Sequence, residues 1–502
     1  MNLATLIARI RGWLAGRSLK RAVRNPESAQ RRILANIIGV NKDTAFGQAH
    51  RFSEVDSYED FRDEVPVRDF EGHRTYVNQI VNGDLHALTA EGPFMLGSTS
   101  GTTSEPKWVP VTETWREQMA GLLRYWIAQA TWAHPGMLMG KVLTIVSPAI
   151  EGYAPSGLAI GSVSGLTSSR VPWVIRRQYA IPYEVSTIAD YDVRYYVIAR
   201  FAFESKVSTA VTPNPSTLIR LAAVGAENAQ RIIDSIRSGR LGVDIPAESP
   251  ADQECLSLLE GMLKPNPRRA NQLQAILEQR GRLIPKDVWP SLAMIGCWLG
   301  GSAGVHARSL HHDFGPVPLR DLGFRATEGT FTVPLEDGTP SGVLAVNANF
   351  YEFIPEEEMD SDTPSYLLAH ELEVGCTYYI IVTTNSGLYR YDINDIVEVT
   401  GWHERAPKIR FLRKGRDMVS IVGEKLHVNQ ALAAAEDARK QTNVDWARFQ
   451  LIPDAEASRY DLLIEPATAE VTDAQLKMFV HAFDAALMVH NPEYPTKRDS
   501  NR

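Results

Sequence analysis

Residues 97–107 read Gly-Ser-Thr-Ser-Gly-Thr-Thr-Ser-Glu-Pro-Lys, and this run of glycines and hydroxyls ends in a lysine. Glycine lets the backbone approach a ligand closely, and successive backbone N–H groups in such a loop form a concave site for an anion. The Ser and Thr hydroxyls add donors that rotate to fit, and Lys107 adds a positive charge. The run therefore predicts a polyphosphate-binding loop, although a flexible Ser/Gly connector has the same composition. It is not a Walker loop, because no Gly-Lys-Ser/Thr follows its second glycine.

The overall composition is that of an ordinary globular protein. The 502 residues are 44% hydrophobic and 22% charged, and their number is too great for one hydrophobic core. The net charge of −8, without a basic block, argues against nucleic acid as the main partner. Cys255, Cys297 and Cys376 lie far apart and lack the spacing of a metal site, which predicts a reducing, cytoplasmic compartment.

The N-terminus has the pattern of an amphipathic helix. Two arginines, Arg9 and Arg11, interrupt the apolar stretch that a signal peptide would need. Such a basic helix packs on the protein's own surface, the interpretation that we favour, or lies on a membrane. No run elsewhere in the sequence is long enough to span a bilayer. The apolar residues at helical spacing are Leu3, Leu6, Ile7, Ile10, Trp13 and Leu14.

The order of the expected elements indicates an α/β protein. Up to about residue 90 the pattern is helical, and beyond it strand-like apolar runs are separated by helical stretches. This alternation predicts a large N-terminal domain, with subdomains, in which β-sheets are flanked by helices. The strand-like runs are residues 142–146, 292–296 and 378–382, with a β-ribbon at 388–402 and helical stretches at 228–237 and 270–280.

The C-terminal segment has the pattern of a small α+β unit. Thr472 and Gln475 form a capping box that opens a helix with an apolar face. A polar joint that contains glycine follows Leu412, so we place the domains at residues 1–411 and 412–502. The other expected elements are a helix at 429–439 and strands at 449–452 and 460–464, and the apolar face is Leu476, Phe479, Val480 and Phe483.

Further motifs along the chain are compatible with nucleotide chemistry. In Phe324-Arg-Ala-Thr-Glu-Gly329 the aromatic ring suits a base, Thr327 suits a phosphate, and Glu328 suits Mg²⁺ beside nucleotide phosphates. In Tyr391-Asp-Ile-Asn-Asp395 a carboxylate at a strand end suits the two hydroxyls of a ribose. Each motif alone also has an ordinary explanation, which is a solvated glutamate in the first case and a turn in the second.

Two other motifs complete the series. Phe350-Tyr-Glu-Phe-Ile-Pro355 is an aromatic strand, a type that more often lies in a core than contacts a ligand. Arg413-Lys-Gly-Arg-Asp417, followed by Gly423-Glu-Lys425, combines a hinge with a lysine that can reach a phosphate. A surface charge cluster is the alternative explanation of that last segment.

The motifs and their order resemble the adenylate-forming superfamily. Within it, the chain is most similar to the plant auxin-responsive (Gretchen Hagen) acyl-acid amido synthetases and their bacterial relatives, from about residue 30 onward. The resemblance rests on Glu64-Val-Pro-Val, Lys107-Trp-Val-Pro, Ala326-Thr-Glu, Tyr351-Glu-Phe-Ile-Pro, Gly387-Leu-Tyr-Arg-Tyr, Val399-Thr-Gly-Trp and Gly423-Glu-Lys.

The resemblance implies a role for each matching residue. Glu328 takes the metal position and Lys425 that of the catalytic lysine of the mobile domain. Phe324 stands where a tyrosine commonly contacts adenine, Thr327 is at a phosphate position, and Asp395 is the ribose carboxylate. The implied nucleotide-binding set is Ser98, Thr99, Ser100, Gly101, Thr102, Thr103, Lys107, Phe324, Arg325, Ala326, Thr327, Tyr351 and Asp395.

The chain departs from the family pattern at three places. The glycine that usually precedes the ribose aspartate is Asn394 here, a residue that tolerates the left-handed conformation. The hinge is ambiguous, because Lys414, Arg416 and Asp417 each match the pivot position. The sequence also stops soon after Asn491-Pro-Glu-Tyr-Pro-Thr-Lys-Arg, where relatives run on, which implies a shortened small domain.

The function implied by the resemblance is ATP-dependent ligation. A small carboxylic acid reacts with ATP, aided by Mg²⁺, and the acyl-adenylate then passes its acyl group to an amine, an amino acid in the first instance. A thiol acceptor such as coenzyme A, and a member that binds acyl ligands without catalysis, are alternatives. A different class, the serine hydrolases, is suggested by Gly300-Gly-Ser-Ala-Gly304, with Ser302 as nucleophile and several histidines nearby.

Overall fold

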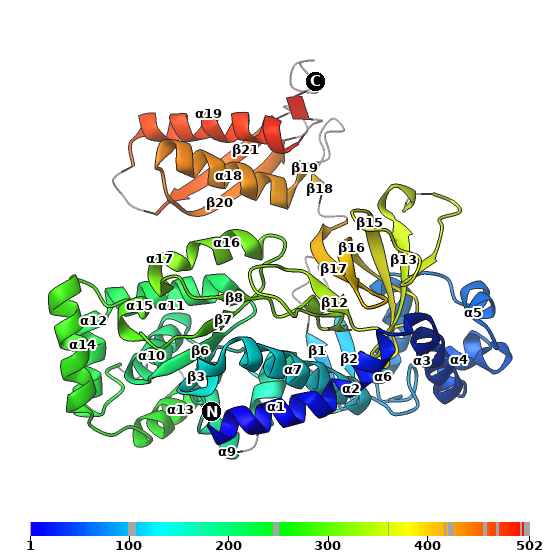
Figure 1. Ribbon diagram of the computed structural model, residues 1–502, viewed down its shortest axis with the longest axis horizontal. Coiled ribbons are helices and arrows are strands. Elements are labelled where there is room, and N and C mark those ends of the chain that lie inside the picture. Colours follow the sequence, from blue (N-terminus) through cyan, green and yellow to red (C-terminus); the bar gives the residue numbers. More distant parts are fainter. Residues whose placement is uncertain are drawn as a thin grey trace.

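The predicted α/β class is confirmed by the computed structural model, in which helices surround several sheets (Figure 1). A broad lower body holds most of the chain, and the last elements form a small separate unit above it. No helix in the described part of the chain is long and apolar enough to cross a membrane. The structure describes residues 2–98, 107–171, 173–243, 250–359, 361–415, 418–419, 426–454, 459–467, 471–491 and 494–495.

The N-terminal region is helical, as predicted. Polar residues cap the starts of these helices. At the start of α3, the Asn25 side chain accepts a hydrogen bond from the Ser28 backbone N–H, and Pro26 is the first helical residue. At the start of α5, Ser57 and Asp60 form a capping box. The elements are α1 (Leu3–Ala15), α2 (Arg17–Ala22), α3 (Pro26–Asn41), α4 (Ala45–Ala49), the 3₁₀ turn η1 (Phe52–Glu54), α5 (Tyr58–Glu64) and α6 (Phe70–Val81).

A seven-stranded antiparallel sheet forms the centre of the main hydrophobic core. Its aromatic strand Phe350–Pro355 is buried, and the expected strand at 378–382 and ribbon at 388–402 pair beside it. The strands, in spatial order, are β11 (Thr332–Val333), β12 (Gly342–Leu344), β17 (Ala406–Lys414), β16 (Tyr391–His403), β15 (Thr377–Thr383), β13 (Phe350–Pro355) and β14 (Leu367–Leu368), with η4 (Glu356–Glu358) after β13.

A parallel four-stranded sheet carries the second large core, which its surrounding helices cover. The helices expected at 228–237 and 270–280 are present, and the strands expected at 142–146 and 292–296 form over residues 141–144 and 294–296. The strands are β3 (Lys141–Thr144), β6 (Val207–Val211), β7 (Met294–Gly296) and β8 (Leu319–Arg320). The helices are α9 (Trp173–Arg176), η3 (Tyr183–Thr187), α10 (Tyr191–Glu204), α11 (Pro215–Glu227), α12 (Ala229–Ser238), α13 (Pro250–Gly261), α14 (Pro267–Arg280), α15 (Pro285–Val288), α16 (Ala303–Ser309) and α17 (His311–Phe314).

The first two residues of the glycine- and hydroxyl-rich run, Gly97 and Ser98, lie at the end of a strand in a third sheet. Strand β1 (Met95–Ser98) pairs antiparallel with β2 (Trp108–Val111), and Ser98 lies opposite Trp108. Residues 99–106, between the two strands, lie outside the described residues. The neighbouring elements are β5 (Ala159–Gly161), β4 (Gly152–Tyr153), α7 (Glu113–Ala133), η2 (Pro135–Leu138) and α8 (Val163–Ser169), with the short hairpin β9 (Arg325–Ala326) and β10 (Gly329–Thr330).

The C-terminal unit has its own small hydrophobic core. The Thr472–Gln475 capping box is present, and Phe479 and Phe483 are buried as predicted, but Val480 is exposed, because it lies on the solvent edge of the helix. Strand β17 continues past Leu412 to Lys414, and the division at residues 411 and 412 stays a prediction. The elements are β18 (Met418–Val419), β19 (Leu426–His427), α18 (Val428–Thr442), β20 (Trp446–Asp454), β21 (Arg459–Pro466) and α19 (Asp473–His490).

Candidate functional site

The Thr327–Glu328 pair forms the turn of a short hairpin beside the glycine-rich run. Ala326 and Gly329 pair with each other, so the two residues between them form the tip. The Thr327 hydroxyl donates to the Ser98 carbonyl over 3.5 Å. A Cβ at Gly97 would lie 2.4 Å from the Thr327 methyl group, so this close approach requires glycine. The tip therefore lies against the first residue of the predicted phosphate loop.

Glu328 is a buried carboxylate with few protein partners. Its side chain accepts from the Tyr391 hydroxyl over 3.4 Å, and its backbone carbonyl accepts from the Trp115 indole over 2.9 Å. Burial raises the pKa of Glu328 above its ordinary value, and the positive charges of Lys414 and Lys107 oppose that rise. The site thus holds an acidic side chain in a position where added positive charge is favourable.

Asp395 is the second buried carboxylate of the site. It lies on β16 directly opposite Lys414 of β17, and the Lys414 ammonium forms an ion pair with it over 2.5 Å. Burial raises the pKa of Asp395 to about 7, while Lys414 lowers it and Glu328 raises it. The same ammonium donates to the Ile393 carbonyl over 3.2 Å, which holds it at the strand end.

The substitution Asp395→Asn is expected to change how stability depends on pH. A carboxyl group with a raised folded-state pKa stabilises the fold at low pH, and that contribution is lost as pH rises through the folded pKa. Because the pKa of Asp395 is raised to about 7, the free energy of unfolding of the wild type should fall by about 2–3 kcal/mol between about pH 5 and about pH 8. The Asn variant should not show this fall. Urea unfolding at both pH values measures this difference. Asp43→Asn, at an exposed carboxylate, is the control, and an equal pH dependence in Asp395→Asn and wild type would contradict the assignment.

Asn394 shows how the chain accommodates its departure from the family pattern. It adopts a left-handed conformation with φ = 59°, as the tolerance of asparagine predicts. Its backbone N–H donates to Asp392 over 2.7 Å, and its carbonyl accepts from Gly415 over 2.8 Å. These contacts fix the backbone immediately before Asp395.

The glycine-rich turn at residues 300–304 borders the same region. Gly301 has φ = 54°, and a Cβ there would lie 2.9 Å from the Phe411 ring. That ring also lies 5.6 Å from the ring of Phe324. Ser302 occupies the N-cap position of α16 without a capping hydrogen bond from its side chain, and within the described chain its hydroxyl makes no hydrogen bond to a histidine. Backbone packing therefore explains the Gly-x-Ser-x-Gly pattern, and the hydrolase interpretation has no support.

The predicted site residues divide into four groups. Ser98, Thr327, Glu328 and Asp395 are linked by the contacts above. Phe324 is buried against Phe331 and Phe411, and Tyr351 is fully buried with its hydroxyl on the Ala345 carbonyl, so the structure lends no support to a direct nucleotide contact by Tyr351. Lys107 precedes β2, and Arg325 and Ala326 form β9. Thr99, Ser100, Gly101, Thr102, Thr103 and Lys425 lie outside the described residues.

Sequence reasoning missed the partners of the two carboxylates. Tyr391 was part of a quoted motif without a role of its own, and Lys414 was considered only as a pivot. The alternation of the β16–β17 hairpin is the signal that could have paired Lys414 with Asp395, because direct cross-strand neighbours lie within contact distance. The contact between Tyr391 and Glu328 has no local signal, since 63 residues separate the two positions.

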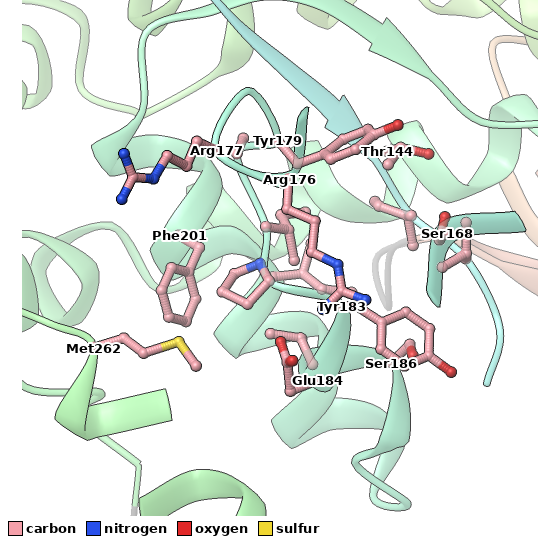
Figure 2. Close-up of a pocket in the computed structure, with 17 residues that line it drawn as sticks. Thr144, Ser168, Arg176, Arg177, Tyr179, Tyr183, Glu184, Ser186, Phe201 and Met262 are labelled. Atoms are coloured by element: carbon pink, nitrogen blue, oxygen red, sulfur yellow. The ribbon is translucent and has the colours of Figure 1, made fainter. Parts of the chain in front are cut away.

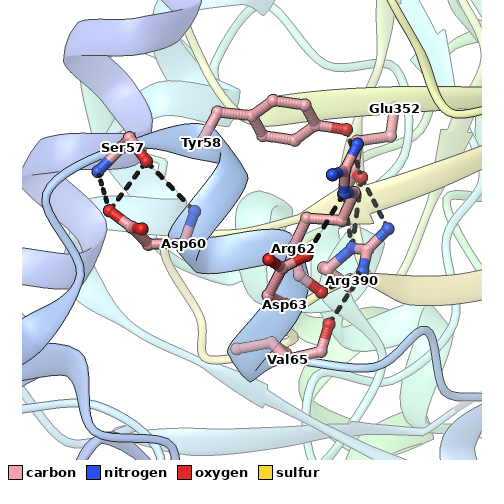
Figure 3. A network of polar contacts seen from close by, with 8 residues as sticks. All are labelled: Ser57, Tyr58, Asp60, Arg62, Asp63, Val65, Glu352 and Arg390. Carbon is pink, nitrogen blue, oxygen red and sulfur yellow. Dashed lines mark hydrogen bonds and ion pairs between the residues drawn. The ribbon is translucent and has the colours of Figure 1, made fainter.

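Three quoted motifs meet in one buried polar network (Figure 3). Arg390 and Glu352 form an ion pair at 2.8 Å, with side-chain exposures of only 3% and 1%. The Arg390 guanidinium also donates to the carbonyls of Arg62 and Val65, and the Tyr58 hydroxyl donates to Glu352 over 2.9 Å. Arg390 immediately precedes Tyr391, so this network anchors the start of the strand that carries Asp395.

A cavity of about 340 Å³ lies among residues 144–262, beside the parallel sheet (Figure 2). Figure 2 shows Phe201 and Met262 on one side and Ser168 on the other. The Ser186 hydroxyl at its lining has no hydrogen-bond partner among the described residues. Helix α8 lies between this cavity and strand β1. Ser168, near the end of α8, lines the cavity. Val163, at its start, would lie 3.5 Å from a Cβ at Gly97 of β1.

The fold of the chain is similar to that of two solved structures. The chain superimposes on 2-hydroxyisobutyryl-CoA ligase, crystallised in its postadenylation state, with a TM-score of 0.53 at 13% identity, over 94% of this chain and 86% of that chain. It superimposes better on the GH3.15 acyl acid amido synthetase, with a TM-score of 0.80 at 21% identity, over 93% and 83% of the two chains.

The chain belongs to the GH3 family. Residues 15–319 match the GH3 family N-terminal domain, and residues 342–414 match the GH3 family central domain. Among its relatives, indole-3-acetic acid-amido synthetase GH3.3 of Arabidopsis thaliana is 24% identical over 91% of this chain and 80% of its own length. The 4-substituted benzoates-glutamate ligase GH3.12 of the same plant is 25% identical over 92% and 83%. The predicted family is thereby confirmed.

Proposed function

We propose that this chain is an ATP-dependent ligase that activates a carboxylic acid as its acyl-adenylate and transfers the acyl group to an amino acid. The observation that carries the proposal is the placement of the Thr327–Glu328 tip between the start of the glycine-rich run at Ser98 and the strand of Asp395. GH3 family membership supports it, because relatives named as amido synthetases and as a benzoates-glutamate ligase span most of the chain.

The described residues suit a nucleotide with its metal ion. Asp395 offers the ribose hydroxyls a buried carboxylate, and Ser98 and Lys107 flank the sequence run whose glycines and hydroxyls are typical of a phosphate-binding loop. The described chain holds no cluster of three acidic, histidine or cysteine residues that would bind a metal by itself. Mg²⁺ typically takes one or two carboxylates together with substrate phosphates, and Glu328 fits that habit. Bound there, Mg²⁺ would neutralise charge on the phosphates.

The first step needs electrostatic help more than proton transfer. The substrate carboxylate attacks the α-phosphorus of ATP and displaces pyrophosphate, and it is already a nucleophile, so a general base is not required. Two anions must be brought together, and Lys107 together with the loop amides would stabilise the charge that develops on the phosphoryl oxygens. We assign Lys425 to the same task from the C-terminal unit.

The second step is attack of the amine on the acyl-adenylate, with release of AMP. We propose that residues 412–502 act as a domain that turns about Arg413–Asp417 between the two steps. Strand β17 ends at Lys414, within this proposed hinge. The next residue, Gly415, packs against the Tyr379 ring, because a Cβ at this position would lie only 2.2 Å from the ring. We place the reaction in the cytoplasm, because the three cysteines are unpaired and the reaction consumes ATP.

The test is a panel of carboxylic acids and amino acids scored by release of pyrophosphate and AMP. The proposal expects both products only when acid, amine, ATP and Mg²⁺ are all present. Coenzyme A replaces the amino acid in a parallel arm, and turnover with the thiol alone would identify an acyl-CoA ligase instead. Formation of ADP would rule out acyl-adenylate chemistry altogether.

We further propose that the 340 Å³ cavity receives the apolar part of the acid. Met262 is half exposed at the cavity lining, so Met262→Trp should narrow the cavity without overfilling a core. The expected result is a KM for bulky acids raised by about tenfold, with the KM for ATP unchanged. Leu258→Trp, at an exposed position of α13 outside the lining, is the matched control. Equal KM values in both variants would place the acid elsewhere.

A further inference from the structure

Helix α1 contacts the rest of the protein through its small residues. Gly12 lies against α7 so closely that a Cβ would be 2.2 Å from the Ala128 side chain, and a Cβ at Gly16 would be 2.2 Å from the Tyr125 ring. Arg9 donates to the Thr131 carbonyl over 2.7 Å on the same face. This face supports packing on the protein's own surface, the interpretation that the sequence favoured.

The apolar stripe of α1 lies on the opposite face and is exposed. An amphipathic surface helix ordinarily turns its large apolar residues toward the core, and α1 does the reverse. The residues recur every three or four positions, so they form one continuous stripe. Their exposures lie between 41% and 71%, for Leu3, Leu6, Ile7, Ile10, Trp13 and Leu14.

Neighbouring elements extend this stripe into a patch. Trp132 at the end of α7 is 64% exposed, and the Arg9 guanidinium lies 3.8 Å above its ring. Met139 is 65% exposed and follows Leu138, whose carbonyl accepts from the Asn2 side chain over 2.6 Å. We call these two residues and the six of the stripe the α1 patch. Contiguous exposed apolar surface of this kind marks an interaction site.

The surroundings of the α1 patch are strongly basic in a protein that is acidic overall. The net charge of the chain is −8, yet residues 2–25 hold six basic side chains and no acidic one. Arg17 lies over the Trp13 ring at 5.4 Å, and Arg24 lies 3.8 Å from Glu404 of the main body. The six are Arg9, Arg11, Arg17, Lys20, Arg21 and Arg24.

We propose that the α1 patch binds the surface of an anionic lipid bilayer, with α1 lying in the plane of the interface. Apolar side chains bordered by arginine and lysine are the pattern of an interfacial helix: the side chains enter the acyl region, and the cations contact lipid phosphates. A second copy of this chain fits less well, because a symmetric contact would bring two sets of six positive charges together. In Figure 1, α1 lies in the lower part of the body and the C-terminal unit lies above the body, so the two are on different parts of the molecule.

Sedimentation of the full chain with lipid vesicles tests the proposal. The protein should bind vesicles of phosphatidylglycerol and phosphatidylcholine more strongly than vesicles of phosphatidylcholine alone. The difference between the two affinities should shrink as the salt concentration rises. The double variant Ile10→Asp/Trp13→Asp should lower binding to anionic vesicles by about tenfold or more. Arg11→Glu/Arg17→Glu should lower it by about tenfold through charge alone.

Two controls separate the patch from general effects. Trp13→Phe keeps the apolar surface and should keep vesicle binding, whereas Leu258→Asp changes an exposed leucine elsewhere and should also leave binding intact. Unchanged circular dichroism and unfolding midpoint show that each variant is folded. Equal vesicle binding by wild type and Ile10→Asp/Trp13→Asp overturns the proposal, as does a lipid-independent dimer that this variant converts to monomer.

Discussion

Glu328→Gln is expected to lower the rate of pyrophosphate release by about 10²–10³-fold, because it removes the buried negative charge that would hold Mg²⁺, the ion that neutralises the phosphates. Glutamine keeps the size of the side chain, and the Trp115 bond to the backbone carbonyl is unaffected. The fold should therefore persist while the chemistry fails. The measurement is steady-state pyrophosphate release at saturating acid, amine and ATP.

The dependence on pH and metal identifies the cause of that loss. Burial raises the pKa of Glu328, and metal binding needs the ionised form, so wild-type activity should rise with pH and need more Mg²⁺ at low pH. In the Gln variant the Mg²⁺ concentration needed for activity should no longer change with pH. Tyr391→Phe removes only the hydroxyl that contacts Glu328 and should cost about tenfold or less. A Glu328→Gln enzyme with wild-type turnover would remove Glu328 from the mechanism.

Glu352→Gln should lower the free energy of unfolding by about 3–5 kcal/mol, because it leaves the buried Arg390 charge without its partner. Both side chains are almost fully buried, and Arg390 also adopts a left-handed conformation with φ = 43°. Such backbone geometry persists only where surrounding contacts enforce it. The measurement is urea unfolding at neutral pH.

A double-mutant cycle distinguishes this ion pair from general core damage. Glu352→Gln and Arg390→Met share one interaction, so the double variant should lose less stability than the sum of the two single losses. The matched control is Glu27→Gln, which breaks the exposed pair with Arg31 and should cost about 0.5 kcal/mol or less. Additive losses at Glu352 and Arg390 would contradict a coupled pair.

Local features of the fold were predictable because their causes are local. Three examples depend only on residues within a few positions of one another. They are the Thr472–Gln475 capping box, the strands formed by short apolar runs, and the left-handed conformation of Asn394. The Thr327–Glu328 pair was likewise found by its motif. The exposed Val480 was missed, because helical spacing alone does not tell which edge of an apolar stripe meets a neighbour.

Motifs that carry a family resemblance differ in what they do, and only the structure separates them. Glu352 of the Tyr351 motif and Arg390 of the Gly387 motif bind each other in the core, so they hold strands together. Glu328 and Asp395 are also buried, but each has few protein partners. The two kinds of residue are distinguished by how many protein groups each buried side chain contacts, and these contacts exist only in the folded protein.

The amino-acid sequence by itself determined the family and the α/β class, and it predicted the acidic and glycine-rich residues of the candidate site, because composition, spacing and motif are properties of the chain. The tertiary structure alone decided that Lys414 pairs with Asp395, that Tyr391 reaches Glu328, and that α1 turns its apolar stripe outward. The physical reason is that these outcomes depend on which surfaces meet when distant segments pack, and the small residues Gly12 and Gly16 bring α1 against α7 by the face that carries the least apolar surface.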